Sequence, residues 1–170
     1  FTEGAGAAVS VFSGAAVSTV DAGQLINGLS FTVSGLADGT NEKLTIDGST
    51  IELTAGNNLT STTNGMSINV GSVTNGTTTV TLSKVAGISA AGAATLITGI
   101  KYQNTNVDNP TAGNRVFTLT QVTDTGSDNN TASFSIGSTI VVRAVNDAPV
   151  ITSGTTSTVA ENAAISTVVY

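Results

Sequence analysis

The sequence of 170 residues contains no cysteine, no histidine and no tryptophan. Without thiolates or imidazoles, the chain lacks the ligands of the usual zinc sites. It also lacks the side chains of Cys–His and Ser–His–Asp catalytic groups. Disulfide bonds are impossible, so stability must come from the hydrophobic core and from any bound metal. These absences exclude several large classes of enzyme and of metal-binding domain.

Charged side chains are also scarce, at 9% of the residues, against about 25% in an average globular chain. The five basic residues are scattered singly, and the net charge is −6. Nucleic acids and anionic lipids require a clustered basic surface, so neither is an expected partner. No apolar run approaches the roughly 20 residues of a membrane span, so we expect no membrane insertion. The acidic balance instead suits a cation such as Ca²⁺.

Catalysis and carbohydrate binding have little support in the residue pattern. A glycosidase needs two carboxylates held about 5–10 Å apart in a cleft. None of the eleven acidic residues is flanked by aromatics or organised by a motif. Sugar sites usually use aromatic platforms, and this chain has only Tyr102 and Tyr170 besides its phenylalanines. We expect no enzymatic activity and no carbohydrate ligand.

Apolar and polar residues alternate with a period of two through most of the chain. Leu29, Phe31 and Val33 share one parity, while Ser30, Thr32 and Ser34 take the other. Short alternating segments separated by Gly- and Asn-containing turns are typical of antiparallel sandwiches. The predicted fold class is therefore all-β, an antiparallel β-sandwich. Similar segments contain Leu44 and Ile46, Ile51 and Leu53, Met66, Ile68 and Val70, Val80 and Leu82, and Phe134, Ile136, Ile140 and Val142, with turns at Asn27-Gly28, Asp38-Gly39, Asp47-Gly48, Asn64-Gly65 and Asn75-Gly76.

One segment departs from this alternation and predicts a single short helix over residues 89–99. Ser89 is a suitable N-cap, and Gly99 is a suitable C-terminal stop. Apolar residues recur at helical spacing at Ala93, Leu96, Ile97 and Ile100. We expect this helix to pack over one end of the sandwich.

The last part of the chain has the features of a domain boundary. Pro149 forces its neighbour into an extended conformation, as expected of a linker. The residues beyond it echo the start of the chain, in pairs 158 residues apart, which favours a tandem repeat of that period. The pairs are Glu3 with Glu161, Ala5 with Ala163, Val11 with Val169, and Phe12 with Tyr170. We predict a β-sandwich module over residues 1–143, a linker over 144–150, and the opening strand of a following module over 151–170.

The run Val145-Asn146-Asp147-Ala148-Pro149-Val150, with Glu161-Asn162 after it, resembles the linker and first strand of cadherin-like, immunoglobulin-like tandem repeats in giant secreted bacterial (RTX-type) adhesins. The resemblance implies an immunoglobulin- or cadherin-like sandwich with Ca²⁺ at the domain junctions. Asn146 and Asp147 match the linker ligands, and Glu161 matches a glutamate early in the following domain. Glu3 would take that part at the upstream junction. The fuller linker carries a further aspartate where Ala144 and Val145 stand here.

Asp124 is a further candidate calcium ligand, because it opens the polar run from Asp124 to Asn130. This run fails as an EF-hand, since Asn129 stands at the glycine position and Ser135 at the position of the bidentate glutamate. A polar hairpin tip is the alternative interpretation. Likewise, Asn146 and Asp147 could form only an Asx turn, and Glu3 and Glu161 could be solvated acids.

These observations predict a structural extender repeat of an extracellular bacterial adhesin or surface protein. It would be secreted or displayed at the cell surface, with neighbouring repeat modules as partners. The alternative is a self-assembling filament or surface-layer subunit, in which residues 159–170 complete the sheet of an identical subunit. A ligand-binding adhesin domain is a third interpretation.

Overall fold

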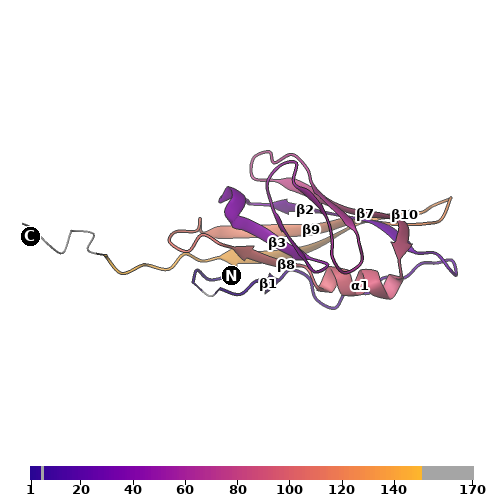
Figure 1. Ribbon diagram of the computed structural model, residues 1–170, viewed down its shortest axis with the longest axis horizontal. Coiled ribbons are helices and arrows are strands. Elements are labelled where there is room, and N and C mark those ends of the chain that lie inside the picture. The colour runs from indigo at the N-terminus through magenta and orange to yellow at the C-terminus, as the bar shows by residue number, and fades with distance from the viewer. Residues whose placement is uncertain (5, 151–170) are drawn as a thin grey trace, which may run out of the picture.

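The computed structural model describes residues 1–4 and 6–150, which form two layers of β-strands with one α-helix (Figure 1). Strands are the commonest element of the described chain, and turns, loops and the helix make up the remainder. The elements are β1 (Val9–Ser10), β2 (Ile26–Ser34), the 3-10 helix η1 (Gly39–Asn41), β3 (Glu42–Ile46), β4 (Ser49–Glu52), β5 (Asn58–Thr60), β6 (Ser67–Val70), β7 (Thr78–Ile88), α1 (Ala90–Thr98), β8 (Lys101–Asn104), β9 (Gly113–Asp124) and β10 (Thr131–Val142).

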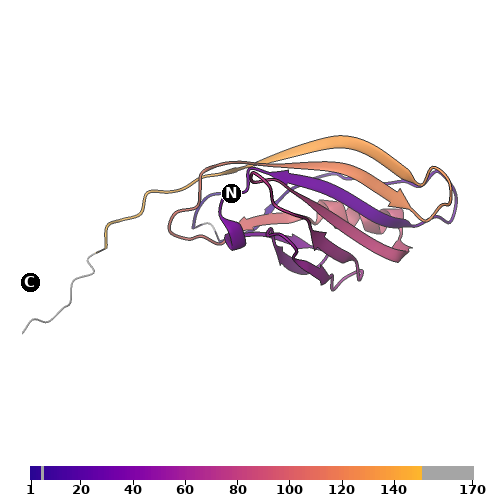
Figure 2. The same cartoon turned by 90° about the horizontal axis from the view of Figure 1, so that it is seen from above.

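The strands form two sheets, which lie one over the other in Figure 2. The smaller sheet has the order β1-β8-β3-β4, and the larger has the order β10-β9-β2-β7-β6-β5. Each ladder between these strands is antiparallel. The predicted all-β antiparallel sandwich with one short helix is confirmed.

The hydrophobic core lies between the two sheets and contains the alternating residues of the sequence pattern. Phe31 and Val33 are fully buried on the inner face of β2, because successive side chains of a strand point to opposite faces. Aromatic rings meet edge to face across the core, with ring centroids 6.4 Å apart for Phe12 and Phe31. The predicted inward positions that are buried are Leu29, Leu44, Ile46, Ile51, Leu53, Met66, Ile68, Val70, Val80, Leu82, Ile140 and Val142.

Helix α1 begins and ends where the sequence predicts. The Ser89 hydroxyl oxygen accepts a hydrogen bond from the backbone N–H of Gly92 at 3.0 Å, which caps the first turn. Ala93, Leu96 and Ile97 are buried against the sandwich. The helix has nine residues, and no helix in the described ranges has the length and hydrophobicity needed to cross a membrane.

Among the dipeptides predicted as turns, two form tight turns and one forms an irregularity within a strand. Asp47-Gly48 and Asn75-Gly76 form tight turns with positive φ at both residues, as predicted. The prediction for Asn27-Gly28 is wrong, because both residues lie inside β2. There the register with β7 and β9 shifts between Ile26 and Gly28. This dipeptide forms an irregularity in a central strand rather than a turn.

Strand β10 follows the predicted alternation in only one of its halves. Ile140 and Val142 are buried, but Ile136 is 55% exposed. The register with β9 shifts between Ser133 and Ile136, which is a bulge that breaks the period of two. Ile136 lies after this shift and keeps the register of Ile140 and Val142, so it shares their face; it is exposed because it lines an open pocket beside residues 11–18.

The strands run lengthwise, so the sandwich has two ends. The linker pole is the end where β10 finishes and residues 144–150, which contain no helix or strand, leave the sandwich (Figure 1). The opposite pole holds the β9–β10 turn. The first residues of the chain also lie at the linker pole, where Thr2 forms a parallel bridge with Arg143. The Arg143 N–H donates to the Phe1 carbonyl at 3.0 Å.

Close backbone packing at the end of β2 gives a first prediction. Gly35 has φ +82°, and a Cβ there would lie 2.1 Å from the carbonyl oxygen of Asn114. Gly14 also has positive φ, but a Cβ there would meet nothing within 4 Å. Gly35→Ala should lower the free energy of unfolding by more than about 3 kcal/mol, and Gly14→Ala by about 1 kcal/mol. Equal losses in urea unfolding would contradict this packing.

Candidate metal centre at the linker pole

Glu3 lies against the start of the linker. Its backbone N–H donates to the Arg143 carbonyl at 2.9 Å. Its side-chain oxygen Oε2 accepts a hydrogen bond from the backbone N–H of Val145 at 2.5 Å. The side chain joins residues 142 positions apart in the sequence, and it holds the N-terminal segment and the departing linker together.

The second carboxylate oxygen of Glu3 has no partner. Glu3 is 7% exposed, and its Oε1 is the one buried side-chain N or O atom without a hydrogen bond in residues 1–4 and 6–150. A buried acceptor without a partner costs about 1–3 kcal/mol, so such atoms usually have a ligand or a donor nearby. Ca²⁺ prefers carboxylate oxygens, and this atom fits that chemistry.

Asn146 and Asp147 follow Val145 directly and are exposed. The Asn146 side-chain amide donates to the Asp147 carbonyl at 3.2 Å. Ca²⁺ takes about six to eight oxygens, yet the described residues contain no group of three or more acids that could hold a metal. The linker pole thus holds Glu3 beside the linker that carries Asn146 and Asp147, and the described residues form no complete metal site there.

The position of Glu3 differs from the expectation. We expected it at the upstream junction, but it lies beside the linker that leads downstream. The reason is that residues 1–3 pair in parallel with the end of β10. Glu161 lies outside the described residues. Its match to Glu3, 158 residues earlier, would assign it to the equivalent place in the following module.

Asp124 lies away from this group, at the opposite pole. It is the last residue of β9, and Gly113 begins that strand at the linker pole. Twelve residues of strand span about 36 Å. The Asp124 carboxylate accepts from the backbone N–H of Gly126 at 2.8 Å, and its own N–H donates to the Asn130 carbonyl at 2.8 Å. These contacts match the alternative interpretation, a polar hairpin tip.

A buried ion pair between the sheets was not predicted from the sequence. Arg115 on β9 is 1% exposed and Glu42 on β3 is fully buried, and the guanidinium Nε donates to the Glu42 carboxylate. Glu42 also accepts the Tyr102 hydroxyl at 2.8 Å. The backbone N–H groups of Ala37 and Asp38 donate to its second oxygen at 2.8 and 3.0 Å. Each oxygen of this buried carboxylate therefore has two donors.

Asp38 extends the same network to the loop between β8 and β9. Its carboxylate accepts from the Thr111 hydroxyl at 2.6 Å and from the Asn104 amide at 2.5 Å. The Arg115 guanidinium reaches both Asp38, at 3.4 Å, and the Thr111 carbonyl, at 3.0 Å. The network thereby fixes the η1 turn and the 105–112 loop at the linker pole.

The network raises the pKa of two of its members. Burial raises the pKa of Tyr102 well above its usual range, and the charge of Glu42 raises it further. Burial alone would lower the pKa of Arg115, but the hydrogen bond and charge of Glu42 outweigh it, so the pKa is raised. Tyr102 is therefore a neutral donor, and Arg115 is a permanent cation.

Comparison with known proteins finds no match among protein-family models, curated proteins or solved structures. Any function must therefore be argued from the residues of this chain.

The buried pair gives a second prediction. Glu42→Gln keeps the shape of the side chain but leaves Arg115 buried without a counter-charge, which should cost about 3–5 kcal/mol of unfolding free energy. The control is Glu52→Gln, which breaks the more exposed Lys43–Glu52 pair, with side chains 29% and 39% exposed. That change should cost less than about 1 kcal/mol. Similar losses in denaturant unfolding would contradict the proposed importance of the buried pair.

Tyr102 gives a third prediction, at alkaline pH. The folded protein holds the Tyr102 proton more tightly than the unfolded chain, in which tyrosine ionises near about pH 10. Stability is therefore fully present below that pH and falls as the pH rises above it. Urea unfolding from pH 8 to 11 should show this fall, and Tyr102→Phe should reduce its slope. Identical slopes for the two proteins would contradict the assignment.

Proposed function

We propose that this chain is a structural extender repeat of an extracellular bacterial adhesin or surface protein, stiffened by Ca²⁺ at the junction between modules. One observation carries the proposal: the buried Glu3 carboxylate is bonded to the linker, and one of its oxygens has no partner among residues 1–4 and 6–150. A tandem protein needs its linkers held at a fixed angle, and a cation shared between Glu3 and the linker would do so.

The ligands that this module would supply are Glu3 Oε1, Asn146 and Asp147. A cation bound there supplies charge neutralisation and a coordination geometry that links two rigid bodies. The remaining oxygens would come from the following module, because the described residues do not complete a site. Asp124, at the opposite pole, would face the preceding module.

The direction of the strands also supports an extender. Residues 144–150 leave the sandwich at one end of its long axis (Figure 1). Strand β10 is bonded to β9 along its length, and its last residues are bonded to Phe1, Thr2 and Glu3. A force along the linker would therefore load many backbone hydrogen bonds together. The Arg115–Glu42 pair fixes the loops at that same end.

The proposal includes a secreted or cell-surface location and no catalytic activity. Only 9% of the residues are charged, so threonine, serine and asparagine supply much of the polar character, which suits an exported repeat protein. The buried acids Glu42 and Asp38 accept several donors each and hold loops in place, so a structural role accounts for them. The alternative, a self-assembling filament or surface-layer subunit, is favoured by the open edge of β10, which could accept a strand from another subunit.

The test compares two modules joined by the native linker, with and without Ca²⁺. Extracellular sites commonly have Kd values near 10⁻⁴–10⁻³ M, so millimolar Ca²⁺ should add roughly 1 kcal/mol per site to the unfolding free energy. Scattering should report a longer and stiffer particle with Ca²⁺ than with chelator. Glu3→Gln and Asp147→Asn in the first module should each remove most of both effects.

The matched control is Glu52→Gln in the first module, which removes a carboxylate on β4 away from the linker contacts. It should leave the response to Ca²⁺ unchanged. If two joined modules have the same shape and melting temperature with Ca²⁺ and with chelator, the junction is a plain linker and the role of calcium must be abandoned.

A further inference from the structure

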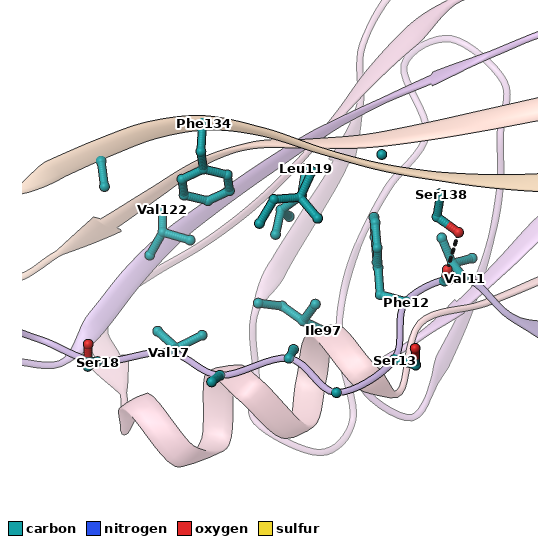
Figure 3. Close-up of a pocket in the computed structure, with 16 residues that line it drawn as sticks. Val11, Phe12, Ser13, Val17, Ser18, Ile97, Leu119, Val122, Phe134 and Ser138 are labelled. Carbon is teal, nitrogen blue, oxygen red and sulfur yellow. Dashed lines mark hydrogen bonds between the residues drawn. The ribbon is translucent and has the colours of Figure 1, made fainter.

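An apolar groove of about 600 Å³ runs along the larger sheet (Figure 3). One wall is the irregular segment 11–18, and the other is formed by β9 and β10. Phe134, Leu119 and Val122 project into it from the sheet, and Ile97 reaches it from α1. None of the described residues that line it is charged. The groove therefore suits an uncharged, partly apolar segment.

The groove lies beside an open strand edge. Strand β10 is the end strand of the larger sheet and pairs with β9 on one side. On its other side, within the described residues, backbone pairing is confined to Phe1, Thr2 and Glu3 at the linker pole. Ser138 bonds through its hydroxyl to the Val11 carbonyl at 2.5 Å. A long edge with exposed Ile136 is a template for another strand.

The pairing of the first residues sets the direction and register of such a strand. Thr2 pairs in parallel with Arg143. An added strand on the same edge of β10, with its last residue next to Phe1, would also run parallel to β10. It would start near the bulge and end at the linker pole. It would pass the mouth of the groove beside Phe134 and Ile136.

Residues 151–158 have the sequence expected of that strand. Val159 stands 158 residues after Phe1, so in the predicted tandem repeat it is the residue that corresponds to Phe1. Residues 151–158 come immediately before it, as the expected strand would come immediately before Phe1. Their sequence, ITSGTTST, has no charge and is rich in the β-branched residues that favour strands. With the offset of 158 residues, residue 160 takes the place of Thr2 and would lie beside Arg143. Counting nine residues back along both strands places Ile151 beside Phe134, at the most apolar part of the groove.

The segment cannot easily occupy this position in its own chain. Seven residues lie between Arg143 and Ile151, and the eight steps from one to the other span at most about 29 Å when fully extended. Along β10, the nine steps from Phe134 to Arg143, just past the end of the strand, span about 30 Å. No residues remain for the reversal of direction, so the partner must be a second molecule.

We propose that the groove between residues 11–18 and β10 binds residues 151–158 of a second copy of this chain, as a strand parallel to β10. The donor leaves its own module at the linker pole and enters the acceptor from the opposite pole. Such contacts are head-to-tail and open-ended, so they produce chains of molecules rather than closed dimers. This inference deepens the filament alternative and is independent of calcium.

The test uses the full chain, in chelator, and sedimentation velocity over a range of concentrations. The acceptor variant is Ile136→Lys, which places a charge at an exposed position in the groove. The donor variant is Thr155→Pro, which removes a backbone donor from the segment. The control is Val85→Lys, at a 98% exposed position on β7, which β9 and β2 separate from β10.

The unmodified chain and the control should form a concentration-dependent series of oligomers. Each of the two variants alone should associate at least tenfold more weakly. An equal mixture of the variants should form a one-to-one complex and stop there, because one intact donor meets one intact acceptor.

Three results of the sedimentation experiments would overturn the proposal. They are a monomeric unmodified chain at millimolar concentration, undiminished assembly of Ile136→Lys, and a mixture of the variants that does not associate. A monomer whose β10 amides lose hydrogen-exchange protection on Thr155→Pro would show pairing within one chain, and it would overturn the proposal too. None of these results bears on the response of joined modules to Ca²⁺, which tests the extender function separately.

Discussion

The arrangement of the linker pole depends on one buried charge pair, Arg115 with Glu42. Two charges between packed sheets are stable only when each is paired and hydrogen-bonded, and both conditions hold here. The donors to Glu42 come from the η1 turn and from β8 and β9, so satisfying this carboxylate fixes where three parts of the chain meet. Asp38 extends the same constraint to the 105–112 loop. The surface from which the linker departs is therefore set from inside the sandwich.

The sequence pattern predicted the sandwich, its helix and much of the core because burial imposes a period of two on strands and helical spacing on α1. It failed at Asn27-Gly28, which is part of β2 at a register shift, and at Ile136, which keeps the inward parity but is exposed beside residues 11–18. The sequence does contain a signal for the buried pair. Glu42 shares the parity of Leu44 and Ile46, and Arg115 shares that of Phe117, so two opposite charges stood at inward positions. Their pairing, like the contact of Glu3 with Val145, depends on which strands are neighbours, and local spacing does not contain that information.

The two proposed uses of the molecule share one structural logic. The end of β10 is bonded to the first residues of the chain, and the rest of its outer edge stays open beside an apolar groove. In a tandem array, a segment that precedes the Phe1 position would cover that edge within the same polypeptide. Between separate molecules, residues 151–158 of a neighbour would cover it. Modules would follow one another along the strand axis in both cases, and the Glu3 carboxylate would face each junction.

The central claim is that Glu3 and the linker share a cation at the junction. Diffraction from two joined modules crystallised with Ca²⁺ tests this claim most directly. The account predicts an anomalous peak about 2.3–2.6 Å from Glu3 Oε1, with Asn146 or Asp147 also in contact with the ion. A junction in which a hydrogen-bond donor from the second module occupies Glu3 Oε1, with no ion nearby, would contradict it.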